Sequence, residues 1–159
     1  MEPLRSREFD RHSQGQERDV KTILHTRFGD LEYDPQNLLR FPEGLIGFET
    51  LRDFIVMPNE KQGPLFWIQS VDDPQVAFVL TDPTHFFLDY RVIPDASERA
   101  KLGVAQEEEC YPLSVVTVHP DRTITLNLMA PILFAPKTNR ALQAILENSG
   151  YSTRQPLPA

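Results

Sequence analysis

Four aspartates lie close together near the middle of the chain, and carboxylate pairs are groups that carry out general acid–base catalysis. They are Asp72, Asp73, Asp82 and Asp89. Asp73 and Asp82 each precede a proline, and an aspartate there is a favoured turn residue because its carboxylate accepts hydrogen bonds from nearby backbone amides. We interpret these residues first as turn formers that present acidic groups. A hydrolase that uses Asp72, Asp73 and Asp82 is the alternative.

The other residue types that support chemistry are scattered. The four histidines are far apart in sequence (His12, His25, His85 and His119), and the single cysteine, Cys110, has no partner at ligand spacing. No Gly-x-Ser-x-Gly motif marks a nucleophile, and Gly44 and Gly47 lack the spacing of a phosphate-binding loop. The sequence therefore predicts no catalytic residue, no metal site and no cofactor.

Adjacent aromatic residues suggest a binding surface. If the segment around Phe86 and Phe87 is extended, these two side chains face opposite ways and one of them is exposed. Exposed aromatics are typical anchors of protein interfaces. The alternative is a platform on which single-stranded RNA stacks. The net charge of -7 and the lack of a lysine or arginine cluster argue against direct nucleic-acid binding.

The length of 159 residues fits one domain, and 40% hydrophobic residues are sufficient for a core. No apolar run is long enough to span a membrane, and one cysteine allows no internal disulfide. A cytoplasmic location is the simplest interpretation. We expect a charged, disordered leader over residues 1–19, a β domain over 20–151 and a frayed, proline-rich tail over 152–159.

Short apolar runs bounded by turn residues predict about nine strands. Gly29 and Asp30 are typical of the turn of a first hairpin, and Gly44 and Gly47 indicate a tight corner with positive φ angles. We expect two consecutive buried strands within residues 64–90, bounded by the turns at Asp73-Pro74 and Asp82-Pro83, a short helix over 94–103, and an edge or bulged strand over 132–135. Residues 140–147 have helical propensity.

This pattern predicts a mainly β fold: a single-domain antiparallel β-barrel-like or sandwich fold with one or two short helices. The 14 prolines argue against a helical bundle.

Several blocks of the sequence, in order, resemble the bacterial flagellar assembly factor FliW family over residues 20–155. The matching blocks are Phe41-x-Glu43-Gly44-x-x-Gly47-Phe48-Glu49, Phe66-Trp67-x-Gln69-Ser70, Ala77-Phe78, Asp82-Pro83-x-x-Phe86, Asp89-Tyr90, Val116-Thr117-Val118, Leu126-Asn127-Leu128-x-Ala130-Pro131-Ile132, Gln143-x-Ile145-Leu146, Tyr151 and Arg154. Each block alone is weak, but the ordered series is specific.

The resemblance implies a monomeric, non-enzymatic protein with a β-barrel-like fold that binds flagellin and the translational regulator CsrA. In the family's logic the two partners compete. Free protein holds CsrA and permits flagellin translation, whereas accumulated flagellin captures the protein and releases CsrA to repress. The resemblance also implies a strand, not a helix, over residues 140–147.

We expect eight residues to face a partner protein: Asp72, Asp73, Asp82, Phe86, Phe87, Asp89, Tyr90 and Asn127. Asn127 is the weakest member, since a polar side chain within a strand can instead serve a neighbouring backbone group. Gly44, Gly47, Trp67 and Phe78 are assigned to the fold.

Overall fold

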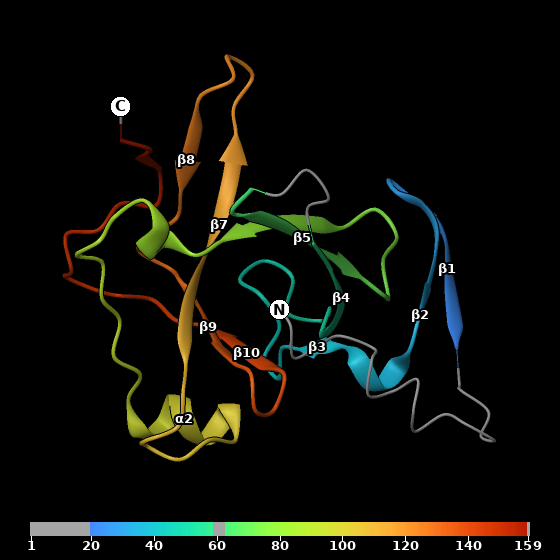
Figure 1. The fold of residues 1–159 in the computed structure, drawn as a ribbon, viewed down its shortest axis with the longest axis horizontal. Coiled ribbons are helices and arrows are strands. Elements are labelled where there is room, and N and C mark those ends of the chain that lie inside the picture. Colours follow the sequence, from blue (N-terminus) through green and yellow to red (C-terminus); the bar gives the residue numbers. More distant parts are fainter. Residues whose placement is uncertain (1–19, 59–62, 159) are drawn as a thin grey trace.

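A computed structural model describes residues 20–58 and 63–158 of the chain, and the predicted leader over residues 1–19 lies outside them. The described part is mainly β (Figure 1). Its elements are β1 (Lys21–Thr26), β2 (Gly29–Tyr33), η2 (Pro35–Asn37), β3 (Leu39–Arg40), β4 (Asp53–Pro58), β5 (Leu65–Ser70), β6 (Ala77–Thr81), η3 (Pro83–His85), α2 (Ala96–Leu102), β7 (Tyr111–Val118), β8 (Ile124–Leu126), β9 (Ile132–Ala135), β10 (Arg140–Gln143) and β11 (Gln155–Pro156).

A ring of strands closes on itself in the order β7, β6, β5, β4, β3, β10 and β9, because β7 also pairs with β9. The predicted barrel-like fold is therefore confirmed. Neighbours in the ring are antiparallel except β3 and β10, which are parallel, with Arg140 opposite Arg40. The barrel interior is apolar and includes Phe41, Phe54 and Ile68, which are fully buried.

The long strand β7 joins two parts of the fold. Its first half pairs with β9 inside the ring, while its second half pairs with β8 in a hairpin that extends from the barrel (Figure 1). The chain end adds β11 to β8, with Gln155 opposite Leu126. The N–H of Leu128 also donates to the carbonyl of Ser152 at 3.0 Å. The expectation of a frayed tail is thus wrong for residues 152–158, because the tail is paired with β8.

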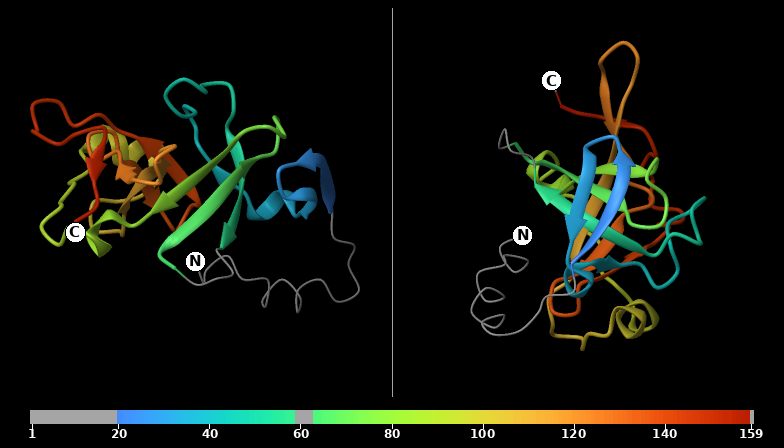
Figure 2. Two further views of the ribbon diagram at one scale, coloured as in Figure 1. Left: turned by 90° about the horizontal axis from the view of Figure 1, so that it is seen from above. Right: turned by 90° about the vertical axis from the view of Figure 1, so that its right-hand side faces the viewer.

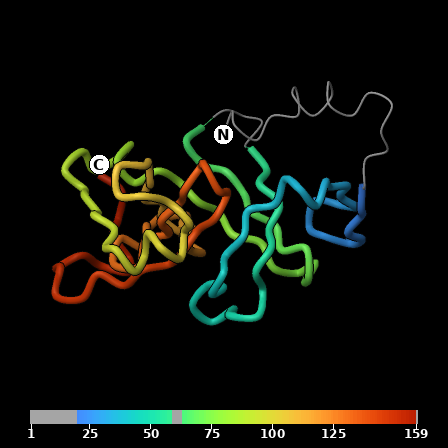
Figure 3. The backbone as a smooth tube through the Cα atoms, turned by 90° about the horizontal axis from the view of Figure 1, so that it is seen from below, coloured from blue at the N-terminus to red at the C-terminus, as the bar shows by residue number. Residues whose placement is uncertain are grey.

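The β1–β2 hairpin forms a separate sheet at the opposite end of the molecule from β11 (Figures 2 and 3). The hairpin was expected, but its turn is made by Arg27 and Phe28 and not by Gly29 and Asp30. Thr26 Oγ1 accepts the N–H of Phe28 at 3.0 Å and donates to the carbonyl of Gly29 at 2.6 Å. These side-chain bonds fix the turn two residues earlier than the sequence pattern indicates.

Two expectations about the second half of the chain change. Strand β9 is not an edge strand: it lies between β10 and β7, and all four of its residues are buried. Residues 140–143 form strand β10, so the strand that the family resemblance implies covers the first half of 140–147. Beyond β10 the N–H groups of Ala144 and Leu146 still donate to the carbonyls of Pro131 and Met129. The pairing with neighbouring strands overrides the helical propensity of this segment.

The only α-helix among the described residues is α2, and the sequence explains both of its ends. Asp95 caps it by accepting the N–H of Glu98, and Glu98 reciprocates to the N–H of Asp95 in a capping box. Gly103 ends it in the left-handed conformation at φ 74°. Leu102 is fully buried against Leu133 and Leu142, so the helix covers the β9–β10 side of the barrel.

Candidate protein-binding surface

The chain turns sharply where β6 ends, and Asp82 makes the turn. Its Oδ1 atom accepts hydrogen bonds from the N–H of Thr84 at 2.9 Å and from its hydroxyl at 2.6 Å, while Pro83 takes the first position of η3. Asp82 is exposed, so its carboxylate is both a cap and a surface charge.

Phe86 and Phe87 follow in a turn and not in a strand. Phe86 is helical, with φ -110° and ψ -28°, and the N–H groups of both residues donate to the carbonyl of Pro83. The segment is therefore not extended, and the condition on which one exposed ring was expected is not met. Both rings are half-buried against a cluster formed by Tyr90, Val116, Leu126 and Leu128.

Tyr90 anchors this turn to the body of the protein. Its side chain is 5% exposed, and its hydroxyl donates to the carbonyl of Leu128 at 2.7 Å. Its ring meets that of Tyr151 edge-on, with centroids 4.8 Å apart. Burial, and next the nearby Tyr151, raise the pKa of Tyr90 well above its ordinary value. The expectation that Tyr90 faces a partner is corrected, because its ring and hydroxyl are both used inside the fold.

The buried anchors leave their neighbours exposed. Leu88 is 87% exposed and Ile93 is 82% exposed, the two highest values among the exposed large hydrophobic residues described. Asp89 and Arg91 between them are also exposed, whereas Tyr90 and Val92 pack inward. We call the exposed side chains of residues 88–93 the Leu88 surface. Sequence reasoning selected Asp89 but missed Leu88 and Ile93. No alternation pattern marks Leu88, because it has the same phase as the inward-packed Tyr90 and Val92.

Asn127 lies near the Tyr90 anchor but serves the backbone. Its Oδ1 atom accepts the N–H of Ala130 at 3.0 Å, and its own carbonyl accepts the hydroxyl of Ser114 at 2.7 Å. The side chain is half-buried. This placement favours the structural interpretation of Asn127.

Asp72 and Asp73 lie in the β5–β6 turn, at the other end of β6 from Asp82. The N–H groups of both residues donate to Ser70 Oγ at 3.1 and 3.0 Å, and Asp73 Oδ1 accepts the N–H of Gln75 at 3.0 Å. Asp72 is exposed and Asp73 half-buried.

Strand β6 separates these two aspartates from Asp82 by about 16 Å at the usual rise per residue. The carboxylates of the hydrolase hypothesis are therefore not gathered at one point. The predicted partner-facing residues likewise divide into two groups, one at each end of the strand.

Among residues 20–58 and 63–158, no three histidine, cysteine, aspartate or glutamate side chains come together as a metal ion would need. In the same ranges, no helix has the length and apolar character required to cross a membrane.

Comparison with known proteins places this geometry in a family. Residues 22–157 match the model of the FliW protein family. The flagellar assembly factor FliW of Syntrophotalea carbinolica is 69% identical over 140 residues, which cover 88% of this chain and all of that relative. Flagellar assembly factor FliW 2 of Desulfotalea psychrophila is 61% identical over 135 residues, covering 85% of this chain and 89% of that protein.

A crystal structure of the flagellar assembly factor FliW superposes with a TM-score of 0.77 at 28% sequence identity, and the match covers 87% of this chain and 98% of the other. The described strand order and the matched sequence thus lead to the same assignment. The chain belongs to the FliW family of flagellar assembly factors.

Proposed function

We propose that this protein acts in the cytoplasm as a non-enzymatic regulator that binds flagellin and, in exchange, a CsrA-type translational regulator. The observation that carries the proposal is the 69% identity to a flagellar assembly factor over that relative's whole length. In this proposal, flagellin displaces the translational regulator, so free flagellin controls its own synthesis.

We further propose that the Leu88 surface contacts one of these partners. A leucine and an isoleucine that are more than four-fifths exposed lose water-accessible apolar area when covered, and this favours association. The exposed Asp89 and Arg91 balance each other within the surface, and the exposed Asp82 nearby in sequence leaves a small excess of negative charge. Such charge speeds encounter with a basic partner and makes the association rate depend on salt.

The turn is held in place before any partner arrives. The bond from Tyr90 to Leu128 and the packing of Phe86 and Phe87 tie it to the β7–β8 side of the fold. A surface that is ordered in advance loses less conformational entropy on binding.

Calorimetric titration tests the function directly. The full chain is titrated with purified flagellin, with CsrA, and with CsrA in the presence of saturating flagellin. We expect heat with each partner alone and loss of the CsrA signal when flagellin is present. Absence of binding to both proteins, repeated by a second method, contradicts the proposed function.

A matched pair of variants tests the surface separately. Leu88→Ser removes the most exposed leucine of the turn, and Val118→Ser makes a comparable change at the 60% exposed end of β7. We expect Leu88→Ser to weaken one partner roughly tenfold, in the range of interface anchors, and Val118→Ser to leave both affinities unchanged. Equal affinities in the two variants would rule out the Leu88 surface as the binding site. They would not contradict the proposed exchange of flagellin and CsrA.

A further inference from the structure

A polar hollow of about 500 Å³ lies between η2, β3 and the turn that joins β9 to β10. Three charged side chains line it, Arg40, Lys137 and Arg140, and all three are basic. The amide side chains of Gln36 and Asn139 also line it. The lining residues include no carboxylate, although Asp53 and Glu108, which lie outside the lining, pair with Arg40 and Lys137.

The two arginines are brought together by the one parallel strand pair of the ring. Arg140 of β10 is directly opposite Arg40 of β3, and the N–H of Arg40 donates to the carbonyl of Asn139 at 2.9 Å. Like charges directly opposite each other across a sheet are unfavourable. Asp53 already offsets part of that cost at Arg40, and a bound anion would offset it at Arg140.

Arg40 and Arg140 differ in how they are neutralised. Arg40 is paired with Asp53, its Nε lying 3.2 Å from Oδ1. Arg140 donates to the backbone carbonyl of Lys101 at 3.4 Å, and none of the carboxylates in the described ranges forms an ion pair with it. Arg140 is exposed, so its guanidinium keeps donors available for a ligand.

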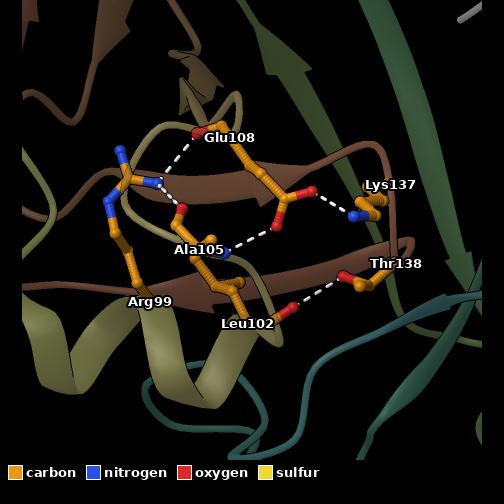
Figure 4. Close-up of polar contacts among 6 residues, drawn as sticks. All are labelled: Arg99, Leu102, Ala105, Glu108, Lys137 and Thr138. Atoms are coloured by element: carbon orange, nitrogen blue, oxygen red, sulfur yellow. Dashed lines mark hydrogen bonds and ion pairs between the residues drawn. The ribbon is translucent and has the colours of Figure 1, made fainter.

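The third cation is held at the rim by its neighbours. Glu108 binds the ammonium group of Lys137 through one carboxylate oxygen and accepts the N–H of Ala105 at 2.6 Å through the other (Figure 4). The hydroxyl of Thr138 donates to the carbonyl of Leu102 at 2.6 Å, which ties the same turn to the end of α2 (Figure 4). The turn that carries Lys137 and Asn139 is thus fixed to the helix.

We propose that this hollow binds an oxyanion, a carboxylate or a phosphate, with Arg140 as its main ligand and Arg40, Lys137 and Asn139 as supporting donors. A guanidinium matches the two oxygens of either group through paired hydrogen bonds. The site is lined by other residues than the Leu88 surface, and it goes beyond the proposed partner switch.

The test uses inorganic phosphate and citrate as separate probes, at an ionic strength held constant with sodium chloride. The amide resonances of the ¹⁵N-labelled full chain are followed during each titration. We expect saturable shifts confined to Arg40, Thr138, Asn139 and Arg140. Saturation by phosphate alone or citrate alone supports the site and identifies the preferred anion. Shifts that fail to saturate, or that spread over the surface with both probes, overturn it.

Two variants of equal charge complete the test. Arg140→Gln removes the main ligand, and Arg122→Gln removes an exposed arginine outside the hollow. Loss of a charge-assisted hydrogen bond predicts an affinity roughly tenfold or more lower for Arg140→Gln, and an unchanged affinity for Arg122→Gln. Wild-type affinity in Arg140→Gln, with the resonance pattern of a folded protein, overturns the assignment.

Discussion

The hydroxyl of Tyr90 donates a 2.7 Å hydrogen bond to the carbonyl of Leu128, 38 residues further along the chain. This bond joins the turn after β6 to the strand region after β8, and the ring contact with Tyr151 adds the paired tail. Three segments distant in sequence therefore meet at one side chain, and the exposure of Leu88 and Ile93 depends on that junction.

Tyr90→Phe removes only the hydroxyl of this junction. The buried carbonyl of Leu128 loses its side-chain donor, so we expect the free energy of unfolding to fall by about 1–2 kcal/mol. Urea denaturation measures the change. Tyr111→Phe is the control, because Tyr111 is 42% exposed and surface substitutions usually change stability by less than about 0.5 kcal/mol. Equal losses in the two variants would mean that the Tyr90 hydroxyl has no special role.

Charge reversal at the two ends of β6 separates the two groups of predicted partner-facing residues. Asp89→Lys changes the Leu88 surface, whereas Asp72→Lys changes the exposed β5–β6 turn. We expect Asp89→Lys to slow association with a partner, by roughly tenfold at low salt, and Asp72→Lys to leave the rate unchanged. Stopped-flow association at several salt concentrations measures both rates. If Asp72→Lys slows association and Asp89→Lys does not, the binding surface lies at the β5–β6 turn.

The corner between β3 and β4 contains two glycines that should respond differently to alanine. Both have positive φ angles, 71° at Gly44 and 87° at Gly47, as the sequence predicted. A Cβ atom at Gly44 would lie 2.6 Å from the backbone Cα and carbonyl oxygen of Glu49, whereas a Cβ at Gly47 would meet nothing within 4 Å.

We expect Gly47→Ala to lower the free energy of unfolding by about 1–2 kcal/mol, the cost of a left-handed residue with a side chain. Gly44→Ala should cost roughly 1–3 kcal/mol more, because the Glu49 backbone must move. Thermal and urea unfolding of the two variants give this difference. If both variants lose the same free energy of unfolding, the Glu49 backbone can move to accept the new Cβ atom without an energetic cost.

The sequence predicted the fold class and most strands because apolar runs bounded by proline and glycine are local signals. The short helix predicted over 94–103 is confirmed for the same reason, because its ends at Asp95 and Gly103 are local signals. The first hairpin turn was placed wrongly because its position depends on the bonds of the Thr26 hydroxyl. Strand β9 was taken for an edge because ring closure by β7 is a contact between distant segments.

The site was less predictable than the fold. The turn-forming role of Asp82 was predicted correctly because an aspartate before proline is a local signal, and its cap is present. Tyr90 was misplaced because its burial depends on Leu128 and Tyr151, which no local pattern connects to it. Leu88 was missed because an exposed leucine and a buried one look alike in a sequence. Only the packing of its neighbours distinguishes them.

Acid should act on the fold through Glu108. The hydrogen bond from the Ala105 N–H, and next that from Lys137, hold the pKa of Glu108 below its ordinary value of 4.5. A carboxyl whose pKa is depressed by folding stabilises the native state above its unfolded pKa, and this contribution is lost as the pH falls through the folded pKa. We expect Glu108→Gln to be less stable than the wild type at pH 7.

The difference in the free energy of unfolding between the wild type and Glu108→Gln should become smaller as the pH falls below about 4.5. Urea unfolding at pH 7, 5 and 3 follows it, and Glu107→Gln, the exposed neighbour, is the matched control. If the stability difference between the wild type and Glu108→Gln does not change with pH, the lower stability of the variant comes from altered packing and not from ionisation.

The single tryptophan reports on the separate β1–β2 hairpin. Phe28 of its turn meets Trp67 edge-on with ring centroids 5.2 Å apart, and the Arg27 guanidinium lies 4.6 Å from the Trp67 ring centroid. Arg27→Ala removes a cation–π contact of about 0.5–1 kcal/mol. The exposure of Trp67 should then rise, because the hairpin contacts the barrel through this turn.

Tryptophan emission and acrylamide quenching measure that exposure. We expect a red shift and faster quenching in Arg27→Ala under native conditions, and no change in Lys21→Ala, which alters the exposed far end of the same hairpin. If Arg27→Ala keeps the wild-type emission, the hairpin is held in place by contacts other than the Trp67 stack. A two-stranded sheet is marginal by itself in water, so the stack is the contact on which we expect its docking to depend.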